Sequence, residues 1–168
     1  MGIRKLASIL ICLPFLLCLS ANTVLAVRGQ EESLRGLNGV TVEVEILTEL
    51  MQDGLATKQI QSDVVSQLQN AGIKVYSLKE LKNIAGQPFL FIKITGTKIQ
   101  DNWKFYTYSI NVHLLQDAYL ARETESDTYR VSTWFRGLTG HGYLDDIRVR
   151  VKEIISIFIN TYLSVNPI

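Results

Sequence analysis

Residue types that could do chemistry gather near the C-terminal end of this chain, where three glycines surround a histidine. The cluster consists of Gly137, Gly140, His141 and Gly142. It falls between an expected strand and an expected helix, which is where phosphate-binding loops are found. However, it lacks the lysine and hydroxyl that end a nucleotide-binding loop and the glycine spacing of a dinucleotide-binding loop. Two interpretations are open, an anion-binding loop and a flexible connection that needs glycines.

Histidine is the second source of chemistry, and the chain has only His113 and His141. His141 and Asp145 could supply two ligands, but a zinc site needs three or four. Nucleophilic catalysis would need Ser132 or Thr139 beside a histidine, and neither lies in the strained elbow typical of such serines. We therefore expect no catalytic residue, no metal and no cofactor. A small hydrolase centred on His141 and Asp145 is the enzyme alternative.

The first 26 residues are typical of a cleavable secretory signal peptide. Arg4 and Lys5 precede an apolar run over 6–19, and small residues follow at the end of the segment. The run is shorter than the ~20 residues that a membrane-spanning helix requires. We expect cleavage after Ala26, with Ala21 as the alternative site. The product would be periplasmic or secreted, with no transmembrane anchor.

Removing the leader changes the composition of the chain. Both cysteines, Cys12 and Cys18, leave with it, so the mature chain can hold neither a disulfide nor a thiolate metal site. Leu17 precedes Cys18, where a lipoprotein signal would need a small residue, so we expect no lipid anchor. Two of the 17 basic residues also leave, and 15 remain against 16 acidic ones. This balance argues against a nucleic-acid partner.

The remaining chain predicts a polar lead-in over 27–38 and a single α+β domain over 39–168. Alternating apolar residues predict strands, and apolar residues at helical spacing predict helices. The expected elements, in chain order, are a strand over 40–46, a helix capped by Thr57 and ended by Gly72, a strand over 73–76, a short helix begun by Ser77 and Glu80, strands over 89–99, 104–115 and 128–135, and a long helix whose apolar stripe runs from Leu144 to Tyr162.

The order β-α-β-β-β-β-α predicts a two-layer α+β sandwich. An antiparallel-rich sheet of four to five strands would carry two main helices on one face. A three-residue loop over 101–103 would set Ile92 opposite Val112 and Ile94 opposite Ile110, with all four residues facing the helices. On the strand over 128–135, Tyr129, Val131 and Phe135 are expected to face inward.

The predicted layout is similar to those of several small envelope proteins. Among them are the lipoprotein subunit of the lipopolysaccharide assembly machine and the amino-terminal domain of the Tol translocation protein. This resemblance is one of architecture and covers most of the mature chain without any shared motif. It therefore implies a fold and carries no site residue.

The sheet face opposite the helices is the predicted binding surface. Its candidate residues combine aromatic, histidine and arginine side chains, which are typical of interface anchors, and they are Phe91, Phe105, His113, Arg130 and Trp134. Alternatively, the lead-in or the segment 117–127 could cover this face and form a second small core.

These features predict a non-enzymatic envelope protein that binds another protein, or a second copy of itself, through this open face or a sheet edge. A carrier of a lipid or other hydrophobic ligand is the alternative.

Overall fold

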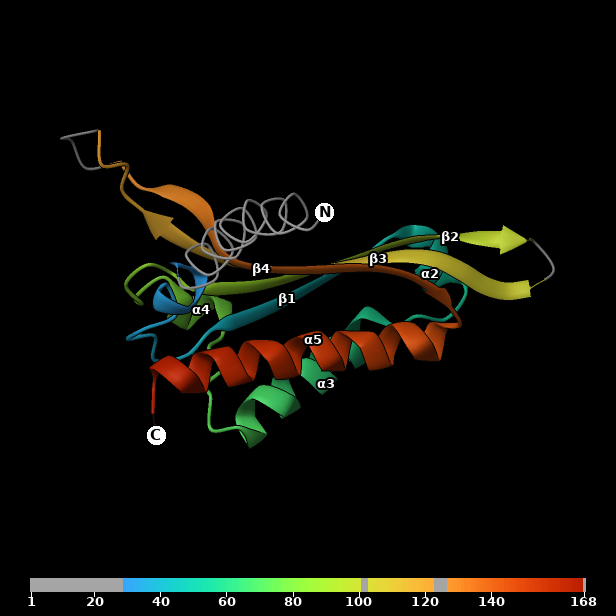
Figure 1. Ribbon diagram of the computed structural model, residues 1–168, viewed down its shortest axis with the longest axis horizontal. Helices are drawn as coiled ribbons and strands as arrows, with labels where there is room; N and C mark the ends of the chain where they lie inside the picture. The colour runs from blue at the N-terminus through green and yellow to red at the C-terminus, as the bar shows by residue number, and fades with distance from the viewer. Residues whose placement is uncertain (1–28, 101–102, 123–126, 168) are drawn as a thin grey trace, which may run out of the picture.

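The computed structural model describes residues 29–100, 103–122 and 127–167 (Figure 1). The expected leader and its cleavage site at Ala26 lie outside the described residues. The elements are β1 (Thr41–Ile46), α2 (Thr48–Gln52), α3 (Thr57–Asn70), α4 (Leu78–Leu81), β2 (Phe89–Gln100), β3 (Trp103–Ala118), β4 (Tyr129–Gly142) and α5 (Leu144–Val165). Among the helices of the described residues, none is both long and apolar enough to cross a membrane.

The fold is α+β, as predicted, with a four-stranded mixed sheet in the order β1-β2-β3-β4. β1 runs parallel to β2, whereas β2, β3 and β4 pair in antiparallel fashion. Parallel strands need a crossover connection, and α2, α3 and α4 supply it. The two main helices, α3 and α5, pack against each other and lie on one face of the sheet (Figure 1).

The core lies between these helices and the inward side chains of the strands. Ile92, Ile94, Ile110 and Val112 are all completely buried. Ile92 pairs with Val112 and Ile94 with Ile110, so the predicted register of the hairpin is confirmed. The loop prediction was wrong in detail, because a register shift between residues 98 and 100 allows position 100 to pair with position 103. Residues 101–102 lie outside the described residues.

The crossover confirms two of the expected helix signals and corrects a third. Ser77 and Glu80 form the predicted capping box of α4, and Gly72 adopts a left-handed φ of 80° after α3. Thr57 was expected to cap α3, but Ala56 occupies the cap position and Thr57 is the first helical residue. The expected strand over 73–76 is reduced to one bridge.

β4 departs from the prediction at a bulge. Leu114 pairs with Trp134, but the next residue, Leu115, pairs with Ser132, so Thr133 is an extra residue. Because side chains alternate along a strand, the extra residue changes which face each following position takes. Trp134 is therefore inward and 1% exposed, whereas Phe135 faces outward and is 39% exposed. The prediction that Phe135 faces inward was wrong.

The glycine cluster is part of β4 and not a connection between strand and helix. Side chains from neighbouring positions occupy the space that a Cβ would need. At Gly140 a Cβ would lie 3.0 Å from the ring of Tyr108, and at Gly142 it would lie 2.7 Å from Asp146 Oδ2. The glycines thus allow close packing over the strand, which is a structural reason for their presence.

The lead-in is held more firmly than expected. Leu34 is completely buried in the core. Ser33 Oγ donates a hydrogen bond to Thr133 O at 3.0 Å, and Asn166 Nδ2 donates one to Leu34 O at 2.8 Å. Tyr162 OH also donates to Leu37 O. The described part of the lead-in is thereby tied to the end of α5, so it does not cover the opposite face of the sheet.

An ion pair joins the two main helices. Arg148 Nε lies 2.6 Å from Asp63 Oδ2, and Arg148 Nη2 lies 3.1 Å from Oδ1, which gives a bidentate contact. The hydrogen bonds from Arg148 lower the pKa of Asp63 to about 2. Since this pKa is below its ordinary value, the pair stabilises the fold at neutral pH, and the stabilisation is lost as the pH falls from about 4 to about 2.

We expect Asp63→Asn to lower the free energy of unfolding at pH 7 by about 1–2 kcal/mol. The difference from the unmodified protein should shrink as the pH is lowered toward 2, because the unmodified carboxylate is then protonated. Urea unfolding at several pH values measures both effects. The exposed pair of Glu153 with Arg150 provides the control, and Glu153→Gln should lower the free energy of unfolding much less than Asp63→Asn does. A constant difference across this pH range would contradict the assignment.

Candidate functional site

The candidate site is the outer face of the sheet, which we define as the face opposite α3 and α5. Register places Glu43, Phe91, His113 and Phe135 in one row across all four strands. Residues on the same row of a sheet share a face, so the row runs along the outer face. Phe91 and His113 are partly exposed, and Phe135 is more so. The short helix α4 lies beside this face, where Leu78 lines one pocket with Glu43 and another with Phe89.

Rings gather on this face in a group that we call the aromatic patch and define as Phe89, Phe91, His113 and Phe135. The Phe89 and Phe91 rings are stacked with centroids 6.4 Å apart. The His113 and Phe135 rings lie 4.6 Å apart and are tilted by 37°. Register joins the two pairs, because Phe91 is directly opposite His113. The patch therefore crosses three neighbouring strands.

The environment of His113 suits a neutral imidazole. Burial lowers its pKa from the ordinary value, because the charged form is less well solvated there. His113 Nδ1 lies 3.0 Å from Ser132 Oγ, and Ser132 Oγ donates to Trp134 O at 3.3 Å. The Ser132 hydroxyl has a single proton, so it either donates to Trp134 O and accepts from His113 Nδ1–H, or donates to an unprotonated His113 Nδ1.

A shallow pocket of about 540 Å³ adjoins the aromatic patch at the end of the sheet near α4. Its apolar walls are Leu78, Leu81, Phe89 and Leu115, and its polar lining residues are Lys82, Gln87 and Arg130. Leu78 is 61% exposed, so α4 presents an apolar side chain to solvent beside the sheet. The pocket thus extends the apolar surface of the patch and gives it a basic rim.

Arg130 has a structural role at this end of the sheet. Arg130 Nε lies 3.0 Å from Asp117 Oδ1 on the neighbouring strand, and its Nη1 donates to Gln87 O at 2.9 Å. Gln87 has a positive φ of 40°, which is unusual for a residue with a side chain. Arg130 therefore fixes the turn before β2, and its guanidinium is already partly used.

The other end of the outer face is also aromatic. The Phe105 ring contacts the rings of His141 and Tyr143, with centroid distances of 5.8 and 5.2 Å. Between the two ends the face is polar, and Lys93 there pairs with Glu45 at 2.9 Å. Phe105 is thus separated from the aromatic patch by a hydrophilic stretch.

Of the five predicted binding residues, four lie on the outer face and one does not. Phe91 and His113 lie in the patch, Arg130 lies at the pocket rim and Phe105 lies at the far end. Trp134 belongs to the core, where its ring packs on Phe158 with centroids 5.1 Å apart. Its assignment to the outer face was wrong. The extra residue at the β4 bulge turns Trp134 toward the core and Phe135 toward the outer face.

The sequence prediction missed other residues of this surface. Phe135 was assigned inward because the bulge is not visible in the alternation. Leu115 could have been found, since the predicted register sets it opposite Phe89. Leu78 and Leu81 come from a four-residue helix, and only their apolar character beside a capping box hinted at a surface role.

The arrangement around the glycine cluster offers little to an anion. Asp146 lies in the first turn of α5 and accepts a hydrogen bond from Tyr143 N at 2.8 Å, so a carboxylate already takes up a donor that an anion would use. His141 and Asp145 form no hydrogen bond with each other in the described structure. Within residues 29–100, 103–122 and 127–167, no group of three His, Cys, Asp or Glu side chains is placed to hold a metal ion.

Two comparisons with known proteins were made, one with protein families and one with curated sequences. No protein-family model matches the chain, and no curated protein matches its sequence. The site is therefore interpreted from its own geometry.

The burial of His113 gives a prediction that can be tested by NMR titration. We expect the His113 ring to titrate below pH 6.5, because its pKa is lowered by burial. Phe135→Ala removes the ring that lies beside it, so the midpoint should rise toward the ordinary value. Tyr143→Ala, at the far end of the face, should leave the His113 midpoint unchanged. An equal rise in both variants would show that the patch does not shield His113.

Proposed function

We propose that the protein is exported by its N-terminal leader and acts in the periplasm, or outside the cell, as a binding module without catalytic activity. The proposal for location rests on the sequence of residues 1–26, with their basic start, apolar run and small residues before the expected cleavage site at Ala26. The proposal for binding rests on the aromatic patch.

One observation carries the binding proposal, namely that aromatic side chains on the outer face are at least partly exposed to solvent. Phe135 exposes 39% of its surface although its neighbour in the chain is in the core. Exposed apolar patches rimmed by polar groups are typical of interaction sites. Aromatic residues are also enriched among the residues that contribute most to binding between proteins. The favoured partner is therefore another envelope protein, with a second copy of this chain as the alternative.

The patch can be tested by capture from a native envelope extract with the tagged mature protein. The double variant Phe91→Ala and Phe135→Ala should weaken capture by at least roughly tenfold, since two exposed anchors are removed. Trp134 is unsuitable for this test because its replacement would open a cavity in the core.

Ile157→Ala is the matched control, because Ile157 is 44% exposed but lies on α5. It should retain capture, and circular dichroism should show that all variants are folded. Equal capture by the double variant and the control would place the interaction elsewhere. Size-exclusion chromatography of the purified protein distinguishes self-association from a different partner.

The pocket beside α4 favours a second candidate function, the carriage of an amphiphilic ligand. Apolar walls at Leu78, Leu81 and Leu115 suit an acyl chain, and Lys82 lies at the rim where it could meet an anionic head group. The exposed fraction of Leu78 means that the pocket is open on one side.

A dansyl-labelled fatty acid is a suitable probe for this second candidate. If the pocket carries amphiphiles, Leu78→Glu should weaken saturable binding by roughly tenfold, because a charge is placed on the apolar wall. Met51→Glu is the control, since Met51 is 43% exposed on α2 and does not line the pocket. Absence of saturable binding, or an equal loss in both variants, would leave protein binding as the proposed function.

A further inference from the structure

The free edge of β1 carries backbone groups that the sheet does not use. Thr41 N donates to Pro88 O and Leu47 N donates to Ile94 O, so alternate residues of β1 bond to β2. In a parallel pair the intervening residues direct their N–H and C=O groups to the other side. For β1 these residues are Val42, Val44 and Ile46, and they face the edge of the sheet.

Segment 75–77 pairs with the start of this edge over one bridge only and then leaves the sheet. Val40 N donates to Lys74 O, and Tyr76 N donates to Val40 O, which forms the single parallel bridge between Val40 and Val75. At Ser77 the chain turns away into α4. The ladder therefore stops after one bridge, and the rest of the β1 edge is left without a strand.

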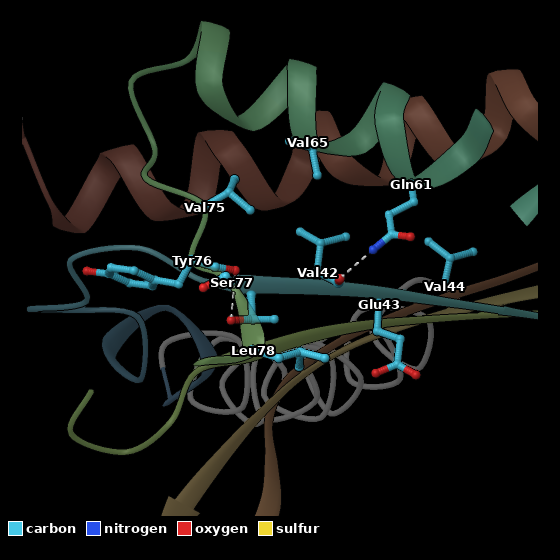
Figure 2. A pocket seen from close by; sticks show the side chains of 10 residues that line it. Val42, Glu43, Val44, Gln61, Val65, Val75, Tyr76, Ser77 and Leu78 are labelled. Carbon is cyan, nitrogen blue, oxygen red and sulfur yellow. Dashed lines mark hydrogen bonds between the residues drawn. The ribbon is translucent and has the colours of Figure 1, made fainter. Parts of the chain in front are cut away.

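A groove of about 470 Å³ lies along the unpaired edge of β1, between β1, α3 and the segment 75–78. Figure 2 shows Val42 and Val44 pointing from β1 toward α3, Val65 pointing from α3 toward β1, and Glu43 on the other side of the strand. The side of the groove toward α3 is thus lined by valines, and the side toward the outer face carries the acidic Glu43.

A side-chain amide already bonds to this edge. Gln61 Nε2 donates to Val42 O at 3.0 Å, and Figure 2 marks this bond. An added strand would supply the same kind of donor, a backbone N–H. The bond from Gln61 thus shows that an edge carbonyl of β1 can accept a hydrogen bond from a group outside the sheet. The other edge-facing groups, at Val44 and Ile46, have no comparable side-chain partner among the described residues.

Charge distinguishes between occupants of the groove. Glu45 pairs with Lys93 at 2.9 Å, whereas Glu43 forms no ion pair in the described structure. A second copy adding its own β1 in antiparallel fashion would bring the acidic side chains of both strands together, which is unfavourable. A strand with basic residues at alternate positions would instead complement Glu43.

We propose that an extended segment of another protein adds to β1 along Val42–Ile46 as a fifth strand, with small apolar residues facing α3 and basic residues beside Glu43. This is recognition by strand addition, in which backbone hydrogen bonds provide affinity and alternate side chains provide specificity. It uses a different surface from the aromatic patch and holds or fails independently of the function proposed above.

The probe is a short acetylated peptide of alternating Lys and Val, with fluorescence anisotropy as the measurement. Binding should be saturable, and the same peptide with Glu in place of Lys should not bind. Glu43→Lys should weaken binding by at least roughly tenfold through repulsion of the peptide's lysines. Glu153→Lys on α5 and Phe135→Ala in the patch are controls that should bind the peptide normally. Equal loss in Glu43→Lys and Glu153→Lys, or no saturable binding, would overturn the proposal.

Two further measurements separate strand addition from attraction by charge alone. N-methylation of one alternate set of peptide residues should abolish binding while methylation of the other set is tolerated, because only one set directs its N–H groups to β1. In hydrogen exchange, the amides of Val42, Val44 and Ile46 should gain protection when the peptide is added. Equal effects of the two methylated peptides, or binding without this protection, would overturn the proposal.

Discussion

The pairing of β2 with β3 is the constraint on which the rest of the structure depends. Side chains alternate along both strands, and the inward residues Ile92, Ile94, Ile110 and Val112 are completely buried. A slip of one residue would move that set into water, so burial fixes the register. The same register sets Phe91 opposite His113 on the other face. The aromatic patch is therefore positioned by the core on the other side of the sheet.

In the described part of the chain, the two main helices α3 and α5 cover one face of the sheet and leave the other face without a main helix. α5 and α3 bury their apolar stripes against the inward side and are joined by the pair of Asp63 with Arg148. The described lead-in adds Leu34 to this same side. An antiparallel sheet with one wet face normally carries polar residues there. Aromatic side chains at this position are costly to hydrate, and this cost is the physical basis of the proposed binding role.

Alternation in the sequence was sufficient to predict the hairpin register, the faces of β2 and β3 and the apolar stripe of α5, because each depends on local periodicity. It was insufficient for β4. The extra residue Thr133 reverses the faces of Trp134 and Phe135, and nothing in the local pattern signals an insertion that the partner strand must accommodate. The glycines of β4 were misassigned for a related reason. Their role depends on Tyr108 and Asp146, which come close only in the folded chain.

The two proposed surfaces meet on the sheet. Glu43, at the edge, is directly opposite Phe91, and Phe91 is opposite His113 in the patch. A strand added to β1 would lengthen this row by one position and bring its outward side chains next to Glu43, with Phe91 on the following strand. The backbone of the added strand would then bond to the edge of β1, and its outward side chains would extend the outer face of the sheet. One partner with an extended segment followed by an apolar surface could thus engage both, and the two contacts would reinforce each other through their effective concentration.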